Sequence, residues 1–190
     1  MSLLINHAQK WAFIHIPKTG GTSISSVLQE IEGTERITMH DSIRALPDSP
    51  NYFIFTFVRN PFTRLQSAFQ HGVRKGEYIN DFSKFLNLKL DSDLWLLPQY
   101  YFTTAGVTEN KNVSFIGKYE NIEKDSITIF NKLKIDKKIP HLNRNPIYDK
   151  HPNLKQHDFY KHMYQEEWMK DWVRERYKND FKIFNYELDI

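Results

Sequence analysis

Near its start, the chain passes from a continuous apolar stretch, through a turn with two adjacent glycines, into a segment with helical spacing of apolar residues. The apolar stretch is Trp11–Ile16, and the turn contains Lys18, Gly20 and Gly21. This order is typical of a buried strand followed by a helix. Such a turn directs backbone N–H groups, the positive end of a helix and an ammonium group toward one point. The segment therefore predicts a phosphate or sulfate site at the end of a strand.

The order of residues in this turn differs from that of an ordinary ATP-binding loop. In the Walker A pattern the lysine follows the last glycine, whereas here Lys18 precedes both glycines. A different phosphorylated nucleotide is therefore the expected ligand. The residues predicted to surround its anionic group are Lys18, Thr19, Gly20, Gly21, Thr22 and Ser23.

Composition limits the classes of protein to which the chain can belong. A chain of 190 residues with 40% hydrophobic and 15% aromatic residues is large and apolar enough for one domain, expected over residues 1–190. The absence of cysteine excludes thiol catalysis, cysteine-ligated zinc and disulfides. A net charge of +3 gives no indication of nucleic acid as a partner.

Location and assembly are less constrained by the sequence. No apolar run approaches the roughly 18 residues of a membrane span, and the first residues lack the pattern of a signal peptide. We expect a cytoplasmic protein without stable membrane insertion. The sequence does not indicate an oligomeric state.

Segments with strand patterns alternate with segments with helical patterns along the chain. The predicted strands cover residues 11–16, 36–39, 51–58 and 113–118. The predicted helices cover residues 22–31, 62–72, 81–90, 92–102, 122–133 and 158–177, with Thr22 or Ser23 capping the first and Asn60 the second. This alternation predicts an α/β layered fold with a central parallel sheet flanked by helices.

Three charged or titratable residues each follow a different predicted strand. Lys18 follows the first strand, His40 the second and Arg59 the third. Parallel strands joined by right-handed crossovers have their carboxyl ends at one edge of the sheet, where ligands of open α/β sheets bind. We therefore expect these three residues to face one crevice.

The three residues differ in the chemistry that they can supply. Arg59 ends a buried strand, where its charge requires either an internal carboxylate or an anionic ligand. Ser67 follows two helical turns later, so that a hydroxyl and a guanidinium together could hold a phosphate. His40 is either structural or a general base. The other histidines are too scattered to predict a metal site.

Two segments resemble the nucleotide-binding motifs of one enzyme family. Residues 16–23, Ile-Pro-Lys-Thr-Gly-Gly-Thr-Ser, resemble the 5′-phosphosulfate loop of sulfotransferases that use 3′-phosphoadenosine 5′-phosphosulfate (PAPS). Residues 57–69, Phe-Val-Arg-Asn-Pro-Phe-Thr-Arg-Leu-Gln-Ser-Ala-Phe, resemble the family's 3′-phosphate motif. Weaker matches are Pro98-Gln99, residues 116–121 (Ile-Gly-Lys-Tyr-Glu-Asn), His141-Leu-Asn143 and residues 180–186. Together they resemble the carbohydrate branch, which includes heparan sulfate 2-O-sulfotransferases and small bacterial relatives.

This resemblance implies a P-loop-type fold with three layers, and a role for each motif. Residues 18–23 would hold the 5′-phosphosulfate, and Arg59 with Ser67 would hold the 3′-phosphate. Lys18 would act in catalysis, and His40 lies where this branch has its catalytic histidine. The implied co-substrate is PAPS without a metal, and the implied acceptor is a hydroxyl, on a glycan or another small molecule. Lys118 departs from the family, whose members commonly have arginine there.

Two other functional classes remain open at this point. One is a P-loop kinase of a nucleotide or small molecule, which requires ATP and magnesium. The other is a non-catalytic module that binds a nucleotide or a sulfated glycan. Binding of adenosine 3′,5′-bisphosphate in preference to magnesium-ATP discriminates against the first, and sulfate transfer discriminates against the second.

Overall fold

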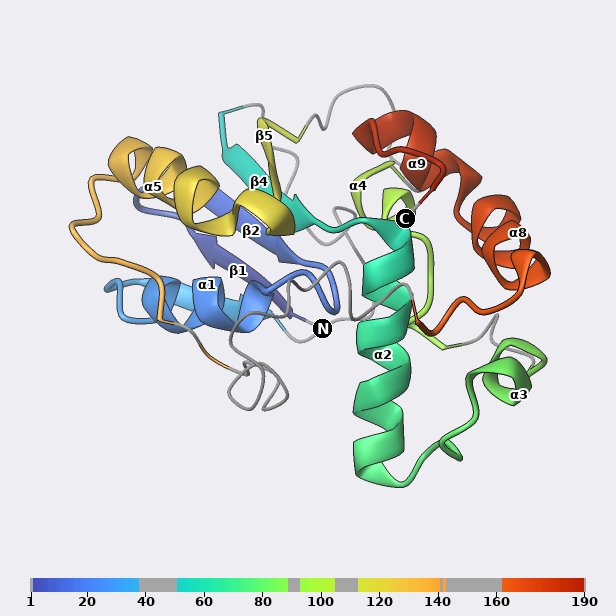
Figure 1. Cartoon of the computed structure of the whole chain (residues 1–190). Helices are drawn as coiled ribbons and strands as arrows, with labels where there is room; N and C mark the ends of the chain where they lie inside the picture. The colour runs from blue at the N-terminus through green and yellow to red at the C-terminus, as the bar shows by residue number, and fades with distance from the viewer. Residues whose placement is uncertain are drawn as a thin grey trace. The chain divides into compact units, whose positions relative to one another are not determined.

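The computed structural model describes residues 2–37, 51–88, 93–104, 113–140, 142 and 162–189. The chain forms two compact units, each assembled from separate stretches of sequence (Figure 1). Unit 1 contains Met1–Arg59 and Gln99–Asn143, and unit 2 contains Asn60–Pro98 and Arg144–Ile190.

Unit 1 is built on a five-stranded sheet with the order β3-β1-β2-β4-β5. Its strands are β1 (Ser2–Asn6), β2 (Trp11–His15), β3 (Thr34–Ile37), β4 (Phe53–Val58) and β5 (Phe115–Lys118). Strands β2, β4 and β5 pair in parallel, whereas β1 is antiparallel to both β2 and β3. Because β2 and β3 are each antiparallel to β1, they run in the same direction. The carboxyl ends of β2, β3, β4 and β5 therefore lie at one edge of the sheet.

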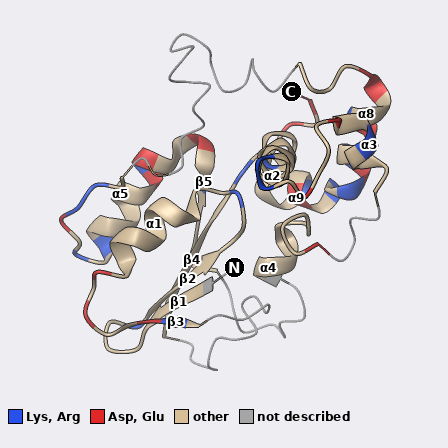
Figure 2. Ribbon diagram, turned by 90° about the horizontal axis from the view of Figure 1, so that it is seen from below, with Lys and Arg blue, Asp and Glu red and all other residues tan. Residues whose placement is uncertain are grey.

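Helices cover both faces of this sheet. Unit 1 contains α1 (Gly21–Leu28), α4 (Tyr100–Thr104), a single 3₁₀ turn η2 (Tyr119–Asn121) and α5 (Ile122–Lys132). Figure 2 shows α1 and α5 on one face and α4 on the other. The first of these faces has a continuous apolar core of Leu4, Trp11, Phe13, Ile24, Val27, Leu28, Phe55, Phe57, Ile129 and Phe130. The expected α/β class, with a central and mostly parallel sheet flanked by helices, is confirmed.

The structure differs from the sequence-based expectations for unit 1 in two respects. Strand β1 was not predicted, and its insertion makes the sheet mixed rather than wholly parallel. Helix α1 begins at Gly21, and the N-cap position is Gly20 rather than Thr22 or Ser23. Since Gly20 has φ +81°, the chain enters the helix from the left-handed region, where glycine is favoured.

Unit 2 consists of helices around a second apolar core. They are α2 (Pro61–Lys75), α3 (Phe82–Leu86), α8 (Glu167–Arg176) and α9 (Lys178–Phe184). The buried cluster between them contains Phe62, Leu65, Phe69, Phe82, Phe85, Met169, Val173, Tyr177 and Phe181, among others. The predicted cap of α2 is confirmed, because Asn60 Oδ1 accepts a hydrogen bond of 2.9 Å from the N–H of Phe62.

Three predicted helices, over residues 81–90, 92–102 and 158–177, are wrong in extent, and the first of them ends at Leu86. Residues 93–98 form turns instead of a helix, because Arg64 binds the carbonyl oxygens of Trp95 and Leu97 and Pro98 disfavours a helix before it. The helix expected over residues 158–177 is shorter, and α9 follows it. Residues 158–161 lie outside the described residues, and Tyr164 contacts the carbonyl oxygen of Phe62 instead of extending the helix. Within the described residues, no helix has both the length and the hydrophobicity needed to cross a membrane.

Candidate anion-binding site at the sheet edge

The turn between β2 and α1 has the backbone geometry of an anion-binding nest. Lys18 and Gly20 both adopt the left-handed region, with φ +68° and +81°. The buried Thr19 hydroxyl donates to the carbonyl oxygen of Ile16 over 2.9 Å, which closes the turn. The first amides of a helix have no partner inside it, and the first turn of α1 contains no acidic residue. The turn therefore concentrates positive potential at the carboxyl end of β2.

Only glycine fits at the two central positions of this turn. A Cβ atom on Gly20 would lie 2.5 Å from Ile122 Cδ1 and 2.9 Å from Tyr119 Cδ2. A Cβ atom on Gly21 would overlap the imidazole ring of His15. The backbone is thus held between β2 on one side and the start of α5 on the other, which leaves its amides in one defined arrangement.

His15, at the end of β2, forms part of the support for this turn. The pKa of His15 is lowered to about 4, chiefly by burial and in smaller part by nearby positive charges that include Arg36 and Lys18. The ring is therefore neutral at pH 7, and it stacks at 6.0 Å on Phe13. His15 lies within the strand predicted over residues 11–16. The structure shows that it packs against Gly21.

Arg59 follows β4 and contacts the turn directly. Its side chain is buried, with 3% of the residue exposed, and Nη1 donates to the carbonyl oxygen of Lys18 over 3.3 Å. Its guanidinium carbon lies 4.2 Å from the ring centre of Tyr119, a distance typical of a cation–π contact. Tyr119 therefore contacts Arg59 with its ring and limits the space at Gly20.

Gln99 holds the backbone of Arg59 at the end of β4. Its Oε1 accepts from the Arg59 N–H and its Nε2 donates to the Arg59 carbonyl oxygen, each over 2.8 Å. Gln99 is fully buried, so the two hydrogen bonds satisfy both polar groups of its amide in place of water. This pairing fixes the position from which the Arg59 side chain extends.

The structure brings some of the predicted site residues together. Lys18 and Arg59 share a hydrogen bond, as expected from strands whose carboxyl ends lie at one edge. The buried hydroxyl of Ser23 accepts from the N–H of Leu142 over 3.2 Å, which leaves its own proton available for donation. Thr22 is exposed on the first turn of α1.

Other predicted residues are not brought into this arrangement. His40 lies outside the described residues, although β3 ends at Ile37 on the same sheet edge. Ser67 is half-buried in α2 of unit 2, whereas Arg59 belongs to unit 1. Their joint contact with one phosphate stays a prediction. In the part of the chain that the structure describes, no group of three or more His, Asp or Glu side chains is placed to hold a metal ion.

Sequence reasoning did not assign a role to Tyr119 or Gln99. Both lie in segments that had been noted as weak family matches, Pro98-Gln99 and residues 116–121. Their functions depend on contacts with Gly20 and Arg59, which are at least 40 residues away in the sequence. The motif signal was sufficient to find the residues, and only the contacts show what they do.

Comparisons with known proteins give one result. Residues 1–187 match the model of the sulfotransferase family. No curated protein and no solved structure matches the chain significantly.

Proposed function

Because the chain belongs to the sulfotransferase family, we propose that it transfers the sulfuryl group of PAPS to a hydroxyl of an acceptor, a carbohydrate by our reading of its motifs. The observation that carries this proposal is the turn of Lys18, Gly20 and Gly21 in contact with Arg59. A buried guanidinium, a lysine in the turn and a helix N-terminus at one sheet edge fit a nucleotide with anionic groups at both ends. The family match extends over both units, which supports one catalytic domain over residues 1–190.

The proposed chemistry is direct, in-line transfer. The acceptor oxygen forms a bond to sulfur while the bond between sulfur and the bridging phosphate oxygen breaks, and adenosine 3′,5′-bisphosphate leaves. Lys18 and the amides of residues 19–22 stabilise the charge that grows on the departing phosphate. The rest of the catalysis is positioning of the two reactants.

The remaining residues are assigned to binding and proton transfer. Arg59 and Ser67 bind the 3′-phosphate, for which the planar guanidinium is well suited. His40 accepts the proton of the acceptor hydroxyl as general base, a contribution of about 10²–10⁴-fold in rate. No step of this scheme requires a metal ion, because Lys18 supplies the positive charge.

Binding of the nucleotide tests the donor assignment. We expect adenosine 3′,5′-bisphosphate to raise the melting temperature in a thermal-shift assay more than magnesium-ATP does. Lys18→Ala and Arg59→Ala should each weaken this binding by about tenfold or more. Lys124→Ala, which changes an exposed lysine of α5, is the matched control and should bind normally. Equal stabilisation by magnesium-ATP would favour a kinase.

Transfer of a radiolabelled sulfuryl group from PAPS to a panel of acceptors tests the reaction itself. His40→Ala should bind adenosine 3′,5′-bisphosphate normally and lose turnover. Full transfer by His40→Ala would remove this residue from the role of base. Nucleotide binding without transfer to any acceptor would favour a non-catalytic binding module.

A further inference from the structure

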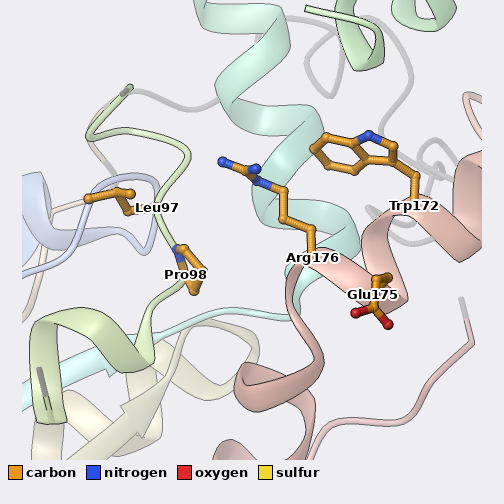
Figure 3. Close-up of a pocket in the computed structure, with 5 residues that line it drawn as sticks. All are labelled: Leu97, Pro98, Trp172, Glu175 and Arg176. Carbon is orange, nitrogen blue, oxygen red and sulfur yellow. The ribbon is translucent and has the colours of Figure 1, made fainter. Parts of the chain in front are cut away.

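Unit 2 contains a pocket whose lining has no part in the proposed donor site. The pocket has a volume of about 580 Å³, within the usual range for small-molecule sites. Its lining residues are Leu97, Pro98, Trp172, Glu175 and Arg176, and Figure 3 shows them on two separate segments. Leu97 and Pro98 form one wall, and three residues of α8 form the other.

The wall formed by Leu97 and Pro98 is held in place by two buried side chains. Arg64 donates to the carbonyl oxygens of Leu97 and Trp95 over 2.9 and 3.0 Å. The Tyr177 hydroxyl donates to the carbonyl oxygen of Leu96 over 2.8 Å. The carbonyl groups of three consecutive residues, Trp95, Leu96 and Leu97, therefore accept hydrogen bonds from buried side chains. These bonds hold the wall in place although it belongs to no helix or strand.

The opposite wall combines an aromatic face with a guanidinium. Trp172 and Arg176 are separated by one helical turn, and the guanidinium carbon of Arg176 lies 5.3 Å from the Trp172 ring centre. Arg176 also makes a side-chain hydrogen bond to Tyr177. In Figure 3 the guanidinium lies between the Trp172 indole and the wall of Leu97 and Pro98. Both groups are therefore oriented before any ligand arrives.

The pocket has one basic lining residue, Arg176. Its one lining carboxylate, Glu175, accepts a hydrogen bond of 2.7 Å from the ammonium group of Lys178. In Figure 3 the Glu175 carboxylate points away from the guanidinium. The guanidinium therefore faces an apolar slot of a leucine, a proline and an indole.

We propose that this pocket binds a small molecule with a ring and one anionic substituent. The ring packs against the apolar groups of the pocket lining, Trp172, Leu97 and Pro98, and the carboxylate or sulfate group accepts hydrogen bonds from Arg176. Arginine suits this task because its planar fork matches such groups, and tryptophan provides a flat apolar platform. An aryl acid and an acidic sugar share this chemistry. The proposal does not depend on the donor site binding PAPS.

Titration of the full-length protein with paired probes tests the site. The indole N–H signals of the four tryptophans are followed by NMR, and the signal of Trp172 is assigned from a Trp172→Phe variant. Benzoate and glucuronate are compared with their neutral counterparts, benzamide and methyl glucoside. We expect the Trp172 signal to shift with an anionic probe, and the matching neutral probe to bind about tenfold more weakly. The stronger of the two anionic probes identifies the type of ring.

Variants separate the contributions of charge and ring. Arg176→Gln should weaken binding of the anionic probe by about tenfold, and Arg176→Lys by less. Trp168→Phe and Lys182→Gln change exposed neighbours outside the pocket lining and should bind as the unaltered protein does. Equal binding of charged and neutral probes, or no shift of the Trp172 signal in the unaltered protein, would overturn the proposal.

Discussion

At the scale of single residues, the turn between β2 and α1 contains two glycines that a larger residue cannot replace without a steric clash. Gly20 and Gly21 are enclosed by Tyr119, Ile122 and His15, and a buried imidazole stays neutral beside Lys18. Each of these residues affects the position of the turn amides through packing. Their energetic effects can be measured separately from catalysis.

The matched pair Gly20→Ala and Gly76→Ala separates crowding from backbone strain. Both glycines have positive φ, +81° and +74°, but nothing lies within 4 Å of a Cβ atom at Gly76. Gly76→Ala should cost only the left-handed strain, about 1–2 kcal/mol of unfolding free energy. Gly20→Ala should cost a further 1–3 kcal/mol or so, because Ile122 and Tyr119 must move.

Urea unfolding of the two variants measures this difference. The nucleotide affinity of Gly20→Ala should fall as well, whereas that of Gly76→Ala should not change. Equal stability of the two variants would show that the turn has more space than the structure indicates.

His15 predicts a specific dependence of stability on pH. Its pKa is about 4 in the folded protein and 6.5 as the ordinary value, so between these values the unfolded chain binds a proton that the folded chain does not. The stability that neutral His15 contributes is present above pH 6.5 and is lost as the pH falls toward 4. The loss amounts to about 3 kcal/mol at most.

Unfolding free energies at pH 7 and pH 4.5 test this prediction. His15→Phe cannot titrate at this position, so its stability should fall less between the two pH values than that of the unaltered protein. His7→Phe, at an exposed position of the same unit, should keep the original dependence. The same pH dependence in all three proteins would assign the effect to carboxyl groups elsewhere.

At the scale of elements, the end of β4 depends on a side chain that acts as a strand partner. Gln99 makes two hydrogen bonds to the backbone of Arg59 in the way that a neighbouring strand would. Gln99→Met keeps the volume and leaves the N–H and carbonyl groups of Arg59 buried without these bonds. We expect a loss of about 2–4 kcal/mol and weaker nucleotide binding, because Arg59 is no longer fixed.

The matched control is Gln165→Met, at an exposed position. Unfolding in urea and calorimetric binding of adenosine 3′,5′-bisphosphate measure the two effects. Normal affinity in Gln99→Met would mean that the Arg59 side chain keeps its position without this support.

At the scale of the whole molecule, neither unit is continuous in the sequence. The chain leaves unit 1 after Arg59, returns to it at Gln99 and leaves it again after Asn143. The core of unit 2 therefore joins α2 and α3 to residues of α8 and α9 more than 80 positions later. The first part of unit 2 lacks most of its apolar partners until the last part has been added.

A chain that ends at residue 143 tests this dependence. It loses Met169, Val173, Tyr177 and Phe181 from the core of unit 2, and Phe62 and Leu65 become exposed to water. We expect rapid proteolysis within residues 60–98 and strong binding of a hydrophobic dye. A chain that lacks only residues 188–190 is the control and should resist the protease. Equal resistance of the long truncation would show that α2 and α3 fold without α8 and α9.

Much of the local structure follows from patterns within about ten residues. The apolar run, the two glycines and the helical spacing predicted β2, its turn and α1, and Asn60 with Pro61 predicted the start of α2. These elements are predictable because their determinants, strand burial, turn conformation and helix capping, act between neighbours in the sequence. The region around Pro98 was less predictable, since its carbonyl groups bind Arg64 and Tyr177 instead of a helical neighbour.

By itself, the sequence determined the α/β class, the loop that follows β2 and the arginine that follows β4. Only the tertiary structure decided that β1 lies between β3 and β2, and that Tyr119 lies against both Gly20 and Arg59. The physical reason is the range of the interactions. A periodic pattern reports which face of an element is buried, but the partner on that face is selected by packing between segments far apart in the chain.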